Sequence, residues 1–180
     1  MVEVNFKTIY TIGHSIRSFD AFLALLKSYK IEVLADIRSL PGSRKFPQFD
    51  KENLEKTLPE NGIAYIHLLG LGGRRKVNKN SRNTRWKNDS FRSYADYMET
   101  DLFKNAIEEL EAIALQKTTA YMCAEAVYWH CHRSMVSDYL KSKGWDVIHI
   151  FSENKTEAHR YTSSSRIVNN EVCYYNDSLF

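Results

Sequence analysis

Short runs of β-branched and apolar residues recur along the chain, and a helical pattern follows most of them. The runs cover residues 8–13, 32–36, 63–68, 118–123 and 146–151. Runs of this length and composition are typical of buried strands. Strands that alternate with helices predict an α/β fold, with a mostly parallel five-stranded sheet that has helices on both faces.

Apolar residues at helical spacing fill the intervals between these strands. The first stripe begins after Ser18, a residue type that caps helix N-termini, and covers residues 19–26. Three further helical segments are predicted, over residues 51–58, over residues 94–115 as one long or broken helix with Asp101 as the candidate internal cap, and over residues 134–143. Gly144 is a stop signal for the last of them.

The pattern changes after residue 151. Residues 166–168 and 172–175 are mostly apolar and flank Asn169-Asn170-Glu171, which predicts a small hairpin or an extension at the edge of the sheet. No repeat, low-complexity segment or linker divides the chain. Residues 1–180 are therefore expected to form a single domain.

The composition is that of a packed globule. Hydrophobic residues make up 43% of the chain, with only 7 Gly and 3 Pro. The three cysteines are an odd number without the spacing of a disulfide scaffold, and the first residues lack the apolar stretch of a signal peptide. No window approaches the apolar length of a membrane span. These features predict a cytoplasmic protein that does not enter membranes.

Positive charge is concentrated in one segment. The net charge is only +3, yet residues 73–87 contain seven Lys or Arg and no acid. Such a segment is typical of a phosphate-binding loop, and Trp86 within it favours a function of this kind. The alternative is a solvated loop without a ligand.

Reactive side chains follow several of the predicted strands. In open parallel sheets, ligands bind beyond the carboxyl ends of the strands, where loops and helix N-termini converge. These positions hold His14 and Ser15, Asp36 and Arg38, His67, Cys123 and Glu125, and His149. Their concentration at strand ends predicts a polar site at this edge of the sheet.

Six segments together resemble the signature of one protein family. They are residues 13–15, 36–43, 65–73, 91–98, 123–133 and 159–168, and the most specific is CAEAVYWHCHR at 123–133. Over nearly its whole length the chain is similar to the family called domain of unknown function 488. Asn169-Asn170 stands where the resemblance implies an Asp-Gly turn, which leaves the hairpin geometry open. The family name implies no particular chemistry, so function must be argued from the residues.

Several mechanisms lack support in the sequence. A tyrosine-phosphatase loop needs five residues between its cysteine and its arginine, and Trp129 stands where that arginine would be. Walker, GxGxxG and GxSxG motifs are absent. Zinc is an alternative because Cys123, Cys131, His130 and His132 are suitable ligand types, but CxxC and HExxH spacings are missing. We therefore expect no metal and no cofactor, with Cys123 as a small buried side chain.

Glu125 is the first catalytic candidate. A carboxylate two residues beyond a buried strand can transfer protons, and apolar neighbours would raise its pKa. Asp36 would supply a second carboxylate, supported by His14 and His132. Two carboxylates at adjoining strand ends could hydrolyse a glycosidic or N-glycosidic bond. The alternative is a structural network in which both carboxylates pair with nearby arginines.

The basic loop follows the third strand at the same edge, so phosphate binding and chemistry would be neighbours. The predicted substrate-binding residues are Ser15, Arg38, Arg44, Lys45, Phe46, Arg74, Arg75, Trp86, Tyr128, Trp129 and Arg133. Their cations would bind phosphates, and their rings would stack on a base. We expect a hydrolase acting on a nucleic-acid base or nucleotide, with DNA glycosylase-type cleavage of an N-glycosidic bond as the specific reaction. The alternatives are a phosphodiester or phosphoryl-transfer enzyme and a non-catalytic nucleic-acid-binding module.

Overall fold

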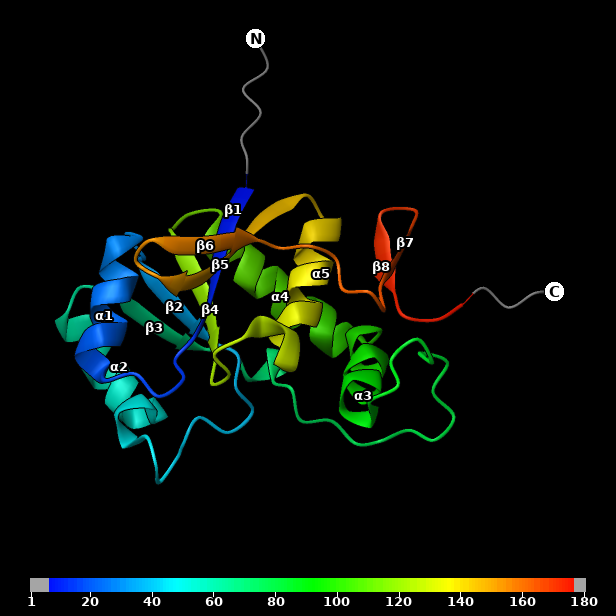
Figure 1. The fold of residues 1–180 in the computed structure, drawn as a ribbon, viewed down its shortest axis with the longest axis horizontal. Helices are drawn as coiled ribbons and strands as arrows, with labels where there is room; N and C mark the ends of the chain where they lie inside the picture. Colours follow the sequence, from blue (N-terminus) through cyan, green and yellow to red (C-terminus); the bar gives the residue numbers. More distant parts are fainter. Residues whose placement is uncertain (1–6, 177–180) are drawn as a thin grey trace, which may run out of the picture.

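The computed structural model describes residues 7–176 and contains a six-stranded central sheet in the order β3-β2-β4-β1-β5-β6 (Figure 1). The strands are β1 (Lys7–Gly13), β2 (Val33–Asp36), β3 (Ala64–His67), β4 (Thr119–Cys123), β5 (Trp145–Ser152) and β6 (Lys155–Ala158). Strands β1 to β5 are parallel, as predicted, and β6 pairs antiparallel with β5. The prediction of five strands is wrong because β6, with the sequence KTEA, is polar and mostly exposed and forms no apolar run.

Helices cover both faces of the sheet, which confirms the predicted layers. One face carries α1 (Phe19–Ser28) and α2 (Lys51–Glu60), and the other carries α3 (Asp89–Met98), α4 (Asp101–Ala114) and α5 (Arg133–Ser142). Leu26 of α1 packs with Ile12 in one core, whereas Phe103 of α4 packs with Ile9 in the other. Short 3-10 turns lie at Pro47–Phe49, Leu69–Leu71 and Tyr128–His130.

The helix caps explain where the helices begin. The Ser18 hydroxyl accepts a hydrogen bond from the Ala21 N–H at 3.2 Å, as expected for the cap of α1. The predicted helix over 94–115 is broken, and its internal cap is Thr100 rather than Asp101. The Thr100 hydroxyl accepts from the Phe103 N–H, while Asp101 lies in the first turn, where a negative charge favours the helix dipole.

The strand register places two groups of reactive residues at one edge but on opposite faces of the sheet. Gly13 pairs with Cys123, and Asp36 pairs with Met122, so β1, β2 and β4 end at the same level. Successive side chains of a strand point to opposite faces. Cys123 shares its face with Tyr121, which packs with α3 to α5. Asp36 points to the face covered by α1 and α2.

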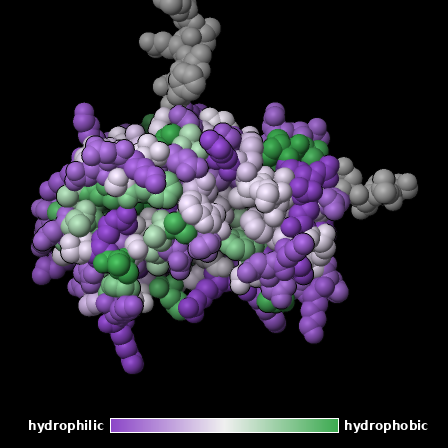
Figure 2. All heavy atoms as spheres, viewed as in Figure 1, coloured by the Kyte–Doolittle hydropathy of each residue, from purple (hydrophilic) through white to green (hydrophobic). Residues whose placement is uncertain are grey.

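The C-terminal segment forms the predicted hairpin, separate from the main sheet. Its strands are β7 (Arg166–Val168) and β8 (Glu171–Cys173). Asn169 and Asn170 have φ values of 52° and 62°, the left-handed conformation that two-residue hairpin turns require and that Asn tolerates. Figure 2 shows hydrophobic surface over this hairpin, where Ile167 is 42% exposed and Val168 39% exposed.

The cysteines and the lengths of the helices bear on the environment of the protein. Cys123, Cys131 and Cys173 are all free thiols. Within the described part of the chain, none of the helices has both the length and the apolar composition needed to cross a bilayer.

Candidate functional site

A cavity of about 400 Å³ opens at the carboxyl ends of β2 and β4. Four of the predicted site residues line it, namely Arg38, Arg74, Glu125 and His132. The cavity is also lined by Cys123, His130 and Cys131, which were not among the predicted catalytic or substrate-binding residues. The polar site predicted for this edge of the sheet is therefore smaller than expected and is centred on β4 and the start of α5.

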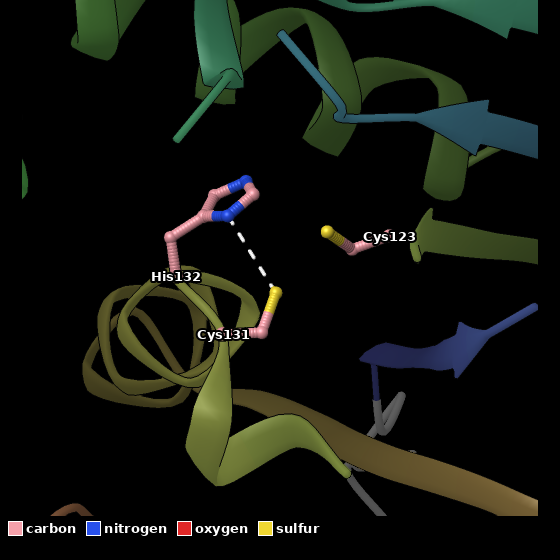
Figure 3. Close-up of side chains that lie close together, drawn as sticks. All are labelled: Cys123, Cys131 and His132. Atoms are coloured by element: carbon pink, nitrogen blue, oxygen red, sulfur yellow. Dashed lines mark hydrogen bonds between the residues drawn. The ribbon is translucent and has the colours of Figure 1, made fainter. Parts of the chain in front are cut away.

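Two thiols and an imidazole converge at this cavity. Cys123 ends β4, whereas Cys131 and His132 immediately precede α5, and their ligand atoms all lie within 4.8 Å of one another. Figure 3 shows the Cys123 sulfur directed toward the other two side chains. Nδ1 of His132 lies 3.5 Å from the Cys131 sulfur. Both thiols are buried, whereas His132 is partly exposed.

The His132 ring is held in a defined orientation. Its Nε2 lies 3.1 Å from the Ile37 carbonyl oxygen, to which only an N–H can donate. This contact assigns the proton to Nε2 in the neutral ring and leaves Nδ1 as an acceptor that faces the thiols. A Cβ atom at Gly73 would overlap the ring at Nδ1, so the glycine at this position lets the basic loop pass beside it.

The cluster favours a thiolate on Cys123. Hydrogen bonding from Cys131, together with the charge of Arg133, lowers the pKa of Cys123 well below its ordinary value. The same Cys131–Cys123 hydrogen bond raises the pKa of Cys131, because Cys131 keeps its proton as the donor. The site thus combines a thiol whose pKa is lowered with a second thiol whose pKa is raised and a ring nitrogen that can accept.

Arg133 supports the turn that carries Glu125. Its buried guanidinium donates from Nη1 to the Thr11 hydroxyl at 3.0 Å and from Nη2 to the Glu125 carbonyl oxygen at 2.9 Å. Gly13 lies so close to this turn that a Cβ atom would overlap the same carbonyl. The Glu125 side chain is exposed, and within residues 7–176 its carboxylate has no hydrogen-bond or ion-pair partner. Arg133 therefore contacts the backbone of Glu125 and leaves its carboxylate free.

Asp36 does not line the cavity. It is fully buried and pairs with Arg38, with Nη2 to Oδ2 at 2.6 Å and Nε to Oδ1 at 2.9 Å. The Tyr65 hydroxyl donates to the same carboxylate at 2.7 Å. The alternative of a structural ion pair therefore describes Asp36, which the register directs to the other face of the sheet. A carboxylate so enclosed has no access to water in the cavity.

His14 and Ser15 lie next to the site without lining it. The His14 ring stacks on Phe49 with centroids 4.3 Å apart, and burial lowers its pKa. Nδ1 of His14 bonds to the Ser15 carbonyl at 2.9 Å, and Nε2 lies 3.3 Å from Nη1 of Arg38. The Ser15 N–H donates to the Ala124 carbonyl at 2.9 Å. These two residues therefore fix the turn after Cys123.

Most of the predicted stacking residues are used inside the protein. Trp86 is partly buried and stacks on Phe91 with centroids 4.7 Å apart. Tyr128 is buried and stacks on His149 at 3.5 Å. The predicted residues Arg44, Lys45, Phe46 and Trp129 also lie outside the cavity lining. Trp129 is 49% exposed and is the most accessible of these rings.

The basic loop is anchored by three of its four arginines, whereas its lysines are exposed. Arg75 lies over the Tyr97 ring at 3.4 Å, Arg82 pairs with Glu99 at 3.0 Å, and Arg85 donates to the Ser164 carbonyl at 2.8 Å. Arg74 is exposed at the cavity, as are the loop residues Lys76, Lys79 and Lys87 at the surface. The loop therefore has both structural contacts and free cations.

The fold and site define a mostly parallel α/β domain with a thiol–imidazole cluster at the carboxyl edge of its sheet. The chain belongs to the family described as Domain of unknown function DUF488, whose model matches residues 18–140. The matched range contains the Cys123 to Arg133 segment, whereas residues 13–15 and 159–168 lie outside it. Comparison with curated proteins and with solved structures finds no match.

Proposed function

We propose that this protein is a hydrolase acting on a nucleotide or on a base in nucleic acid, with its active site in the cavity at the ends of β2 and β4. One observation carries the proposal: the Glu125 carboxylate, which has no partner within residues 7–176, shares this cavity with Arg38, Arg74 and the thiol–imidazole cluster. A carboxylate beside a polar cavity can take a proton from water, and arginines bind phosphates.

The proposed reaction uses one carboxylate. Glu125 takes a proton from a water molecule as the water oxygen attacks the anomeric carbon of the sugar. The C–N bond breaks, and the leaving base takes a proton from His130, which is exposed in the cavity lining. The sugar gains the hydroxyl and the base gains a proton, so the two products together contain one added water. Proton exchange with solvent then returns Glu125 to its carboxylate and His130 to its protonated form. Asp36 takes no part because it is buried in its pair with Arg38.

Cations and rings around the cavity favour a phosphate-bearing substrate. Arg74 lines the cavity, and the basic loop that continues from it carries the exposed lysines Lys76, Lys79 and Lys87. Phe91 and Leu40 supply apolar lining against which a base can pack. The free thiols agree with a reducing compartment, and we retain the cytoplasm as the proposed location.

A second candidate function uses the same residues. A phosphodiesterase would bind phosphate at Arg38 and Arg74 and would use His130 or Glu125 for proton transfer. The two reactions differ in their products, because N-glycosidic cleavage releases a free base whereas phosphodiester cleavage shortens the strand. The position of Glu125 serves both, so the products decide between them.

A product screen tests the proposal. The full-length protein is incubated with free nucleotides and with single- and double-stranded DNA and RNA that carry normal, damaged and abasic nucleotides, with added zinc and with chelator. Mass spectrometry should detect release of a free base from at least one substrate, and Glu125→Gln should abolish this release.

Two results would contradict the proposal. Shortened strands without free base would favour the phosphodiesterase. Binding of nucleic acid without any product would favour the non-catalytic binding module, and Glu125→Gln would then bind as well as the wild type.

A further inference from the structure

We infer that Cys123, Cys131 and His132 form a binding site for one zinc ion. Their three ligand atoms converge from the end of β4 and the start of α5, within 4.8 Å of one another (Figure 3). Zinc binds thiolate sulfur and imidazole nitrogen, and catalytic zinc sites combine three protein ligands with an open fourth position. The ligand set of two cysteines and one histidine is one of these combinations.

The distances suit a tetrahedral ion. A Zn–S bond of about 2.3 Å and a Zn–N bond of about 2.0 Å at a tetrahedral angle place sulfur and nitrogen about 3.5 Å apart. The Cys131 sulfur and the His132 Nδ1 are 3.5 Å apart. Two sulfurs on the same ion would be about 3.8 Å apart, which is also inside the 4.8 Å that encloses the three atoms. Small side-chain movements are sufficient to place all three around one ion.

The surroundings of His132 favour its role as a ligand. Metal-binding histidines commonly donate their second ring N–H to a backbone carbonyl, which fixes the lone pair on the metal-facing nitrogen. The Nε2 contact to the Ile37 carbonyl at 3.1 Å provides this support, and it comes from a residue just beyond β2. The approach of Gly73 to the ring adds a second restraint on its position.

The fourth position of the ion would face the cavity, because all three ligand residues line it together with Glu125. A water molecule bound there would be activated by the ion and could give its proton to Glu125. This role of the ion rests on the proposed function. The zinc site itself rests on the ligand geometry and requires no particular reaction.

Metal titration of the full-length protein tests the inference. Protein freed of metal under reducing conditions is titrated with zinc in competition with a chromophoric chelator, and separately with cobalt(II). We expect one equivalent of zinc per chain. The cobalt form should show the intense visible bands of a tetrahedral site and thiolate-to-cobalt charge-transfer bands.

Serine variants identify the ligands. Cys123→Ser and Cys131→Ser should each lower zinc affinity by more than the roughly 10- to 100-fold that loss of a group supporting a ligand costs. Cys173→Ser is the matched control, because Cys173 is a free thiol outside the cluster, and it should bind zinc like the wild type. Circular dichroism checks the fold, and if a serine variant unfolds, the cobalt spectrum of the wild type decides.

Several results would overturn the zinc site. These are unchanged affinity in both folded serine variants, a cobalt spectrum without thiolate bands, and failure to bind zinc while Cys123 and Cys131 form a disulfide. Zinc binding without hydrolysis would remove the proposed reaction and leave the site intact. Hydrolysis without zinc binding would remove the zinc site and leave the proposed reaction intact.

Discussion

Two histidine-containing clusters at α5 use similar residue types in different ways. The first, which we call the cavity cluster, is Cys123, Cys131 and His132, and it lines an open cavity. The second, which we call the sealed cluster, is Asp138, His149 and His159. Its members are 0%, 1% and 2% exposed and do not line this cavity. The two residues just before α5 therefore belong to a cluster that lines an open cavity. Asp138, within α5, belongs to an enclosed cluster.

The sealed cluster is a chain of hydrogen bonds. Nε2 of His149 lies 2.9 Å from Nδ1 of His159, and Nε2 of His159 lies 2.9 Å from Oδ1 of Asp138. The other carboxylate oxygen of Asp138 accepts from the Thr162 hydroxyl at 2.6 Å and from the Tyr174 hydroxyl at 2.9 Å. The cluster thus attaches the segment after β6 and the C-terminal hairpin region to α5.

Residue type alone does not identify a functional site. In the sealed cluster, Asp138 accepts bonds from three other residues and no solvent reaches it. In the cavity cluster, Nδ1 of His132 faces thiols, and the neighbouring Glu125 carboxylate has no partner among the described residues. Unused bonding capacity beside open space distinguishes a site that can bind a ligand from one that stabilises the fold.

The largest expected effect comes from breaking the sealed cluster. Asp138→Ala leaves buried donors on His159, Thr162 and Tyr174 without their acceptor, so we expect unfolding free energy to fall by roughly 3–5 kcal/mol. Asp146→Ala is the matched control, because Asp146 is exposed, and it should change stability by about 0.5 kcal/mol or less. Denaturant unfolding measures the free energy of unfolding of both variants. If Asp138→Ala loses no more stability than the control, the sealed cluster does not stabilise the fold.

The next effect concerns the turn that carries Glu125. Gly13→Ala introduces a Cβ atom that would overlap the Glu125 carbonyl, so the turn must move. We expect a loss of about 1–3 kcal/mol in stability from overpacking, together with weaker zinc binding. Gly42→Ala is the control, since its nearest neighbour would lie 3.9 Å away. If Gly13→Ala binds zinc like this control, the turn does not position the cavity cluster.

Much of the fold could be predicted from sequence, and particular elements show why. The inner parallel strands β2 and β4 are fully buried and form apolar runs, whereas β6 is exposed at the sheet edge and has no such pattern. Helix α3 begins at Asp89, before the predicted start at 94, because its Asn88 cap follows a basic segment without apolar periodicity. Apolar runs and helical periodicity therefore predict the buried elements. They do not detect a polar edge strand or a helix start that follows a polar segment.

The place of the site in the fold could be predicted from the sequence, but the residues that line it could not. Asp36 lies in β2, where every residue is buried, so the sequence has no alternation that reveals which face the carboxylate occupies. The cavity cluster has no standard metal-binding spacing because Cys123 and Cys131 belong to different elements that meet only in the folded chain. The useful signal was a cysteine at a strand end followed by a Cys-His pair at a helix start.

A smaller, pH-dependent effect sharpens the description of the sealed cluster. Burial, with the charges of His159 and Arg133, lowers the pKa of His149 to about 2. The unfolded chain therefore binds a proton that the folded protein excludes, so stability contributed by neutral His149 is lost as pH falls below about 6.5 toward 2. His149→Gln should reduce the slope of stability against pH in this window by up to about 1.4 kcal/mol per unit. An unchanged slope would mean that His149 titrates equally in both states.

A weaker effect is expected from the exposed lysines of the basic loop. Replacing Lys76, Lys79 and Lys87 with Gln should weaken nucleic-acid binding and reduce its salt dependence, by a slope of about 0.7–0.9 for each phosphate that these lysines neutralise. The control with equal charge change replaces Lys27, Lys30 and Lys56, exposed residues on or next to α1 and α2. Filter binding over a range of salt concentrations compares the two, and equal slopes would show that the loop is only solvated.

Glu125→Gln distinguishes the catalytic role proposed for the open cavity from the structural role of the sealed cluster. The substitution keeps the size of the side chain and removes its charge. With the substrate found in the screen, single-turnover rate should fall by roughly 100-fold or more, while substrate affinity and melting temperature stay near those of the wild type. A variant that melts much earlier but keeps its rate per folded molecule would contradict the account.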